Sequence, residues 1–111
     1  MISFRRVTFP IRAITESGEE KQKQSGANFE IALTVQEIMD ADFGLYLWPS
    51  ALLLADFIWK NQDWFRGKRV LELGAGTGLP GMLCAKIGAK VTLTDSSKNP
   101  RVLKNMREAC K

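Results

Sequence analysis

Apolar and polar side chains alternate strictly in one short stretch of the N-terminal half. Between positions 29 and 35 large apolar residues occupy every second position, which places them on one face of a β-strand. Residues 2–11 are rich in Ile, Phe, Val and Thr and favour another strand. The 15–27 segment has alanine as its only apolar residue type, so we expect a mobile loop there. Together these stretches predict an N-terminal β-hairpin.

A different pattern, with apolar residues three and four positions apart, follows residue 48. Pro49 fixes its own φ and suits the first turn of a helix, so we expect a helix to start at Pro49 or Ser50. Its apolar positions form a wide stripe made of Leu52, Leu53, Ala55, Phe57, Ile58 and Trp59. Gly67 ends the segment that connects this helix to the next strand. We interpret Trp59 and Trp64 as packing residues.

The remainder of the chain alternates between strand and helix patterns. An apolar strand at 70–73 leads through a glycine-rich turn into a helix that ends near Gly88, a residue suited to a left-handed cap. A second strand at 91–95 leads through Asn99 and Pro100, a helix cap and first turn, into a last amphipathic helix. The βαβα order is typical of α/β proteins with a parallel, doubly wound, Rossmann-like sheet.

The length of 111 residues favours one domain. We divide it into an N-terminal β extension, residues 1–47, and the first part of a Rossmann-like domain, residues 48–111. Charge follows a similar division: residues 1–50 carry 5 Lys and Arg against 7 Asp and Glu, whereas residues 51–111 carry 11 against 5. Because the cations are scattered and never form a run longer than two, we expect solvated surface and no specific nucleic-acid binding.

The lack of histidine excludes several kinds of site. Catalysis by Ser-His-Asp or Cys-His and zinc helices all need an imidazole, and two cysteines are too few for an all-cysteine zinc site, so no metal is expected. Cys84 lies on an apolar stripe and is interpreted as a core residue. Two free cysteines without a secretory signal favour the cytoplasm or nucleus. The longest apolar stretch, 51–59, is interrupted by Asp56 and too short to cross a bilayer, so no membrane contact is expected.

The glycine turn is the clearest candidate for a ligand site. Gly74, Gly76 and Gly78 stand at alternate positions between a strand and a helix, where the backbone can approach a ligand and the helix N-terminus can bind an anion. Counted from Gly74, a dinucleotide fingerprint needs its third glycine one position after Gly78, where the chain has leucine, and on this count we expect NAD to be disfavoured. Glu72 precedes the turn and would repel phosphates but attract a cation.

Asp95 ends the second strand, 21 positions after Gly74. In Rossmann-type sites an acidic residue at this place accepts hydrogen bonds from ribose hydroxyls. A ribose, a cationic centre and a carboxylate at a helix N-terminus together describe S-adenosylmethionine. We therefore predict that cofactor.

Three blocks of sequence carry a family resemblance. They read ELGAGTGLPG at 72–81, LWPSA at 47–51 and KVTLTD at 90–95. From about Phe29 onward the chain resembles the seven-strand S-adenosylmethionine-dependent methyltransferases of protein methyltransferase family 16. The resemblance assigns to cofactor binding Trp48, Glu72, Gly74, Ala75, Gly76 and Asp95, and the alternation of the turn glycines adds Gly78. It also implies a protein substrate methylated on Lys or Arg, with histones as one candidate.

A complete fold of this family has seven strands, whereas the chain shows the pattern of its first two βα units. We therefore expect a truncated form, ending inside a helical stripe, that retains half of the cofactor site and lacks most of the substrate site. No residue is assigned to catalysis, and we expect weak or absent activity from the chain alone. The first strand of the parallel sheet is central in the family, so its open edge would invite a partner.

Two alternatives stay open at this point. The chain could be a non-catalytic interaction module that a partner chain completes. It could also be an NAD-type Rossmann fragment, which NAD binding stronger than S-adenosylmethionine binding would favour.

Overall fold

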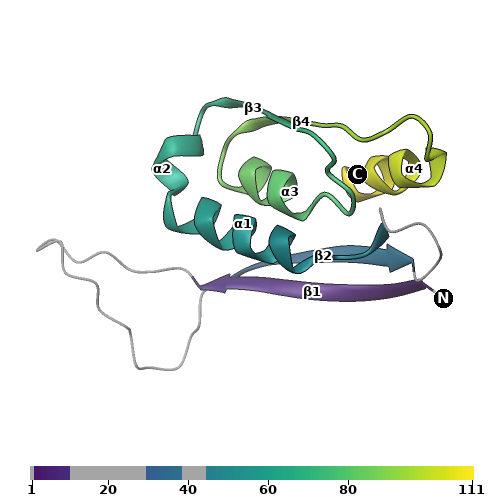
Figure 1. Ribbon diagram of the computed structural model, residues 1–111. Helices are drawn as coiled ribbons and strands as arrows, with labels where there is room; N and C mark the ends of the chain where they lie inside the picture. The colour runs from purple at the N-terminus through teal and green to yellow at the C-terminus, as the bar shows by residue number, and fades with distance from the viewer. Residues whose placement is uncertain (1, 11–29, 39–44) are drawn as a thin grey trace, which may run out of the picture.

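The computed structural model describes residues 2–10, 30–38 and 45–111. The loop predicted at 15–27 and the strand position at Phe29 lie outside these residues. In chain order the elements are β1 (Ile2–Pro10), β2 (Glu30–Ile38), α1 (Pro49–Lys60), α2 (Gln62–Phe65), β3 (Arg69–Glu72), α3 (Leu79–Lys86), β4 (Lys90–Leu93) and α4 (Pro100–Ala109) (Figure 1).

The first two strands pair antiparallel, as predicted. Their register runs without a break from Ile2 opposite Ile38 to Pro10 opposite Glu30. The inward face of β2 holds Leu33 and Val35, which are buried as the alternation requires. β2 continues beyond the predicted pattern, and Glu37 takes the next inward position, where it is also buried.

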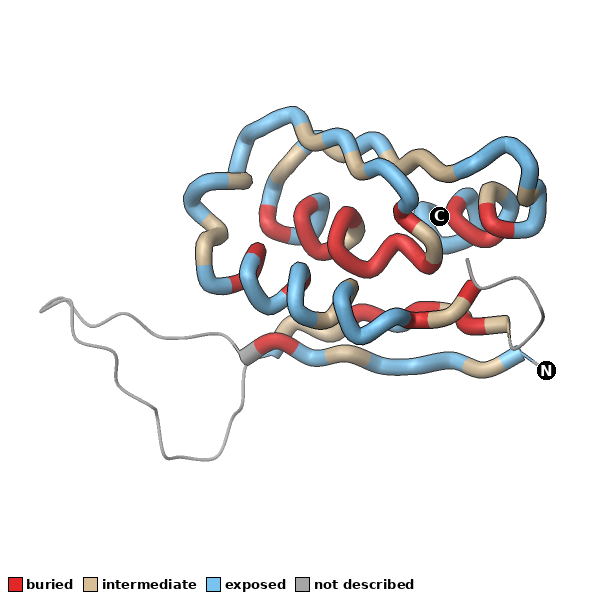
Figure 2. Tube along the Cα trace, in the orientation of Figure 1, coloured by how far each residue is buried: buried red, intermediate tan, exposed pale blue. Residues whose placement is uncertain are grey.

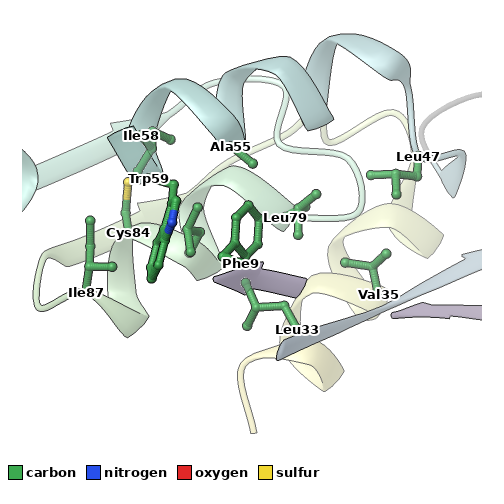
Figure 3. Close-up of a cluster of buried hydrophobic side chains, with 11 residues drawn as sticks. Phe9, Leu33, Val35, Leu47, Ala55, Ile58, Trp59, Leu79, Cys84 and Ile87 are labelled. Atoms are coloured by element: carbon green, nitrogen blue, oxygen red, sulfur yellow. The ribbon is translucent and has the colours of Figure 1, made fainter. Parts of the chain in front are cut away.

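The main core lies where α1 and α3 pack on the hairpin (Figure 3). The rings of Phe9 from β1 and Trp59 from α1 lie 5.5 Å apart between centroids. Leu79, Leu83 and Cys84 of α3 are fully buried in the same cluster, which confirms the assignment of Cys84 to the core. Because α3 contacts β2 on one side and both β3 and β4 on the other, this helix is the centre of the molecule.

β3 and β4 pair parallel, and α3 makes the crossover between them. Their register sets Arg69 opposite Lys90 and Glu72 opposite Leu93. The second βα unit ends in α4, whose Val102 and Met106 pack against Leu45. Two consecutive βα units on a parallel pair fit the Rossmann-like fold class that the sequence predicts.

The two faces of the β3–β4 pair differ in cover. Val70 and Val91 face α3 and pack against the core cluster. Leu71 and Leu73 point to the opposite face and expose 63% and 77% of their surface. Figure 2 shows the contrast, with the inner helix α3 largely red and the trace of β3 pale blue and tan.

The helix predictions hold in part. α1 begins at Pro49 as expected, but only part of its predicted stripe is buried. Trp59 is a packing residue, whereas the same interpretation of Trp64 is wrong. Trp64 lies on α2, a helix the sequence pattern did not predict, and is 66% exposed with an edge-on contact to Phe57. None of the helices in the described part of the chain has the length and apolar character that crossing a membrane demands.

Candidate cofactor site at the glycine turn

The turn between β3 and α3 is built on left-handed glycines. Gly74, Gly76 and Gly78 have φ angles of 64°, 55° and 84°, a region that side chains with a Cβ rarely adopt. A Cβ added to Gly74 would have no other atom within 4 Å, so the backbone conformation and not crowding requires glycine there. Gly74 thus presents bare backbone to open space, whereas Ala75, Thr77 and Gly78 of the same turn are buried.

Asp95 holds this turn against the end of β4. One carboxylate oxygen accepts a hydrogen bond from the Gly76 backbone N–H at 2.8 Å, and the other accepts from the Ser96 N–H at 2.6 Å. The Ala75 N–H donates to the Thr94 carbonyl at 2.9 Å. The structure therefore brings together the predicted residues at 75, 76 and 95, and it gives the carboxylate a role in shaping the turn.

Thr94 is a site neighbour that the sequence analysis missed. Its backbone N–H and its hydroxyl both donate to the Glu72 carbonyl, at 2.9 Å and 2.7 Å. These bonds fasten the carboxyl ends of β3 and β4 together, directly below the glycine turn. A threonine at a strand end gives no distinctive sequence signal, because the residue is common in strands.

The Glu72 side chain turns toward α3 and lies half-buried against its first turn. Its Oε2 atom is buried and has no hydrogen-bond partner among the described residues. Burial raises the pKa of this carboxyl above its ordinary value, and the backbone N–H of Gly81 offsets part of that rise. Burial also raises the pKa of the Cys84 thiol, with the Glu72 charge adding to the effect.

Gly81 is a second residue that the sequence analysis missed. A Cβ at this position would lie 2.5 Å from Glu72 Oε2 and 3.2 Å from Val91 Cγ1, so only glycine lets α3 approach the sheet this closely. The third glycine of the dinucleotide fingerprint serves the same purpose. The signal was present in the spacing, since Gly76, Gly78 and Gly81 read G-x-G-x-x-G, whereas the sequence analysis counted the fingerprint from Gly74.

Trp48 is the N-cap residue of α1 and is 46% exposed. Its ring meets Tyr46 edge-on with centroids 5.0 Å apart. The segment reaches the glycine turn through Leu45, which is buried in one cluster with Ala75. Leu45 and Ala75 thus connect the tryptophan block to the turn.

These groups fit S-adenosylmethionine in chemical character. The turn offers exposed backbone at Gly74, close to the N-terminus of α3. Asp95 and Glu72 supply the negative charge that suits an ammonium and a sulfonium. An open groove of about 500 Å³ lies elsewhere, across the middle of β3 and β4 on the uncovered face, and contains none of these residues.

A parallel βα pair with this turn defines a Rossmann-like α/β protein. The family model of the lysine methyltransferases matches residues 27–110, and the chain belongs to that family. This confirms the resemblance drawn from the glycine turn, the tryptophan block and the strand that ends at Asp95.

Individual relatives support the same membership. The chain is 41% identical over 98 residues to histone-arginine methyltransferase METTL23 of Xenopus laevis. The aligned region covers 88% of this chain and 39% of the relative. It is 38% identical over 85 residues to EEF1A lysine methyltransferase 3 of Mus musculus, covering 77% of this chain and 37% of the relative. For the protein N-terminal and lysine N-methyltransferase efm7 of Schizosaccharomyces pombe the identity is 44% over 66 residues, covering 60% and 26%. The chain thus spans well under half the length of these relatives, and its likeness to methyltransferase-like protein 23 is confirmed.

Proposed function

We propose that the chain supplies the S-adenosylmethionine-binding part of a protein methyltransferase. The observation that carries this proposal is the glycine turn with three left-handed glycines, fastened to the next strand by the bond from the Gly76 N–H to Asp95. Such a turn leaves the Gly74 backbone exposed for a ligand, and Asp95 follows the second strand, where an acidic residue contacts ribose in Rossmann-type sites. Family membership supports the methyl donor over a dinucleotide.

Each predicted cofactor residue has a distinct part in this proposal. Gly74, Ala75 and Gly76 lie against the methionine portion, and Gly78, the N-cap residue of α3, joins the turn to the helix. Each Asp95 oxygen accepts one backbone N–H and keeps a further lone pair for a ribose hydroxyl. Glu72 contributes negative charge from below the turn. Trp48 lies near the cofactor at the edge of the site.

The bound cofactor would supply an electrophilic methyl group on a cationic sulfur, which a nitrogen lone pair accepts. The chain's own residues bind and orient the donor; none is assigned to orienting the acceptor. We therefore propose that the chain, which spans well under half the length of its relatives, has weak or absent activity alone. Measurable turnover by the purified chain would contradict this part of the proposal.

The proposed substrate is a Lys or Arg side chain of a protein. Relatives carry names that specify histone arginine, a lysine of EEF1A, and protein N-termini with lysine. Since these targets differ, we propose only the shared chemistry, transfer to a protein nitrogen, in the cytoplasm or nucleus.

Calorimetric titration of the chain with S-adenosylmethionine tests the proposal. We expect saturable binding that Gly76→Arg abolishes, since arginine is strained at a φ of 55° and adds a cation beside a cationic ligand. Asp95→Ala should weaken binding about tenfold or more through the lost hydrogen bonds. Asp63→Ala is the matched control, because this carboxylate is exposed on α2 and pairs with Arg66. Absence of binding by the folded chain, or tighter binding of NAD, would overturn the assignment.

A second function is favoured by the uncovered face of the parallel pair. Parallel sheets are normally covered on both faces, yet Leu71 and Leu73 are largely exposed. We propose that a partner polypeptide covers this face and the adjoining open strand edge. As an interaction module, the chain would associate through Leu71 without needing a cofactor.

A further inference from the structure

Glu37 is a buried carboxylate in a strand position that the alternation reserves for apolar side chains. It follows Leu33 and Val35 on the inward face of β2 and is only 4% exposed. A charge in such a place is costly unless it is paired and hydrogen-bonded. Its two oxygens have separate partners: Oε2 lies 3.7 Å from Arg5 Nη2, and Oε1 accepts a hydrogen bond from the Leu47 backbone N–H at 2.8 Å.

The bond to Leu47 reaches out of the hairpin to the segment that precedes α1. Leu45 and Leu47 are fully buried on either side of Tyr46, and Trp48 follows directly. Leu47 packs in the main core, whereas Leu45 packs with Ala75 of the glycine turn. The position of residues 45–48 relative to β2 therefore affects how Leu45 packs against the glycine turn.

The neighbouring ion pair of the hairpin provides a comparison. Arg6 and Glu30 also approach to 3.7 Å, but both side chains are well exposed. Glu30 lies at the first position of β2, and its pair stays within the hairpin. An ion pair that only joins the two strands can therefore lie at the surface. Glu37, in contrast, is buried and bonds to a segment outside the hairpin.

We infer that Glu37 is a positioning residue for the cofactor site. Through the Leu47 N–H it fixes residues 45–48, so that Leu45 supports Ala75 from below and Trp48 is held at the edge of the site. Arg5 lies beside the carboxylate and helps to orient it. The inference rests on the proposed function for its effect on the cofactor, while the local positioning can be measured without any ligand.

The test compares Glu37→Leu, Glu37→Gln and the matched surface variant Glu30→Gln in the full chain. Leucine fills the inward position without accepting the Leu47 N–H, whereas glutamine keeps an acceptor oxygen. We expect Glu37→Leu to lower hydrogen-exchange protection of the Leu47 and Gly76 amides about tenfold and to weaken S-adenosylmethionine binding by a similar factor. Glu37→Gln should restore most of both, and Glu30→Gln should change neither.

The readouts separate positioning from a general effect on stability. Binding and exchange are measured well below the unfolding temperature of every variant, where a purely structural role would leave the affinity unchanged. Unaltered Gly76 exchange and affinity in folded Glu37→Leu, or no rescue by glutamine, would overturn the inference. If the unsubstituted chain binds no S-adenosylmethionine, the proposed function fails, and the exchange at Leu47 and Gly76 still decides whether Glu37 positions the turn.

Discussion

The two faces of the β3–β4 pair are built from adjacent residues of the same strands, yet they have opposite environments. Val70 and Glu72 face α3 and lie beneath the core and the glycine turn, while Leu71 between them is 63% exposed. On one face the sheet meets a helix at the closest distance a glycine permits, and on the other it meets solvent. The comparison shows that the cofactor turn depends on the covered face, and it predicts unequal consequences for neighbouring substitutions.

The largest effect is expected at Gly81, where α3 approaches the sheet. Gly81→Val would drive its Cβ into Glu72 and Leu93, and overpacking of this kind costs about 3 kcal/mol of unfolding free energy. Urea denaturation followed by circular dichroism measures the loss. Ala85→Val, on the exposed side of the same helix, controls for β-branching and should cost well under 1 kcal/mol. Equal losses at both positions would show that close helix–sheet contact is not the cause.

A smaller, pH-dependent effect is expected at Glu72 on the same face. Because burial raises the pKa of this carboxyl, the folded chain holds its proton more tightly than the unfolded chain. The stability from this group is full below its ordinary pKa of 4.5 and declines as the pH rises through the raised value. Glu72→Gln should therefore unfold at higher temperature than the unsubstituted chain near neutral pH, and the two curves should converge in acid.

The matched variant for this pH series is Glu108→Gln, since Glu108 lies on the exposed surface of α4 beside Lys111. Its effect should be small and show no such trend. An advantage of Glu72→Gln that shrinks as the pH rises would contradict the assigned burial of the charge.

The sequence predicted the order of elements well because local rules decide it. Pro49 starts α1 as expected, and Gly88 after α3 adopts the left-handed angle predicted for it. Trp64 was misassigned because its exposure depends on whether another element covers α2, which no local pattern reveals. Asn99 occupies the predicted cap position of α4, but its side chain makes no capping hydrogen bond.

For the site, residue types were predictable and contacts were not. The acidic residues at 72 and 95 stood out at the ends of two strands, but the bond from Gly76 to Asp95 and the burial of Glu72 against Gly81 arise only from tertiary packing. Glu37 was missed for the same reason, since a carboxylate after an alternating stretch looks like the end of a strand.

The smallest effect on stability is expected on the uncovered face. Leu71→Thr exchanges one exposed strand residue for another and should change the unfolding free energy by less than about 0.5 kcal/mol. Val70→Thr, one position earlier, buries a hydroxyl against the core and should cost about 1–2 kcal/mol. Thermal unfolding at low protein concentration measures the change in stability. Sedimentation velocity at several concentrations measures association. If a partner covers this face, Leu71→Thr should reduce association while it leaves the isolated chain as stable as before. A loss of stability as large as that of Val70→Thr would mean that Leu71 is already buried in solution, and the two faces would then be equivalent.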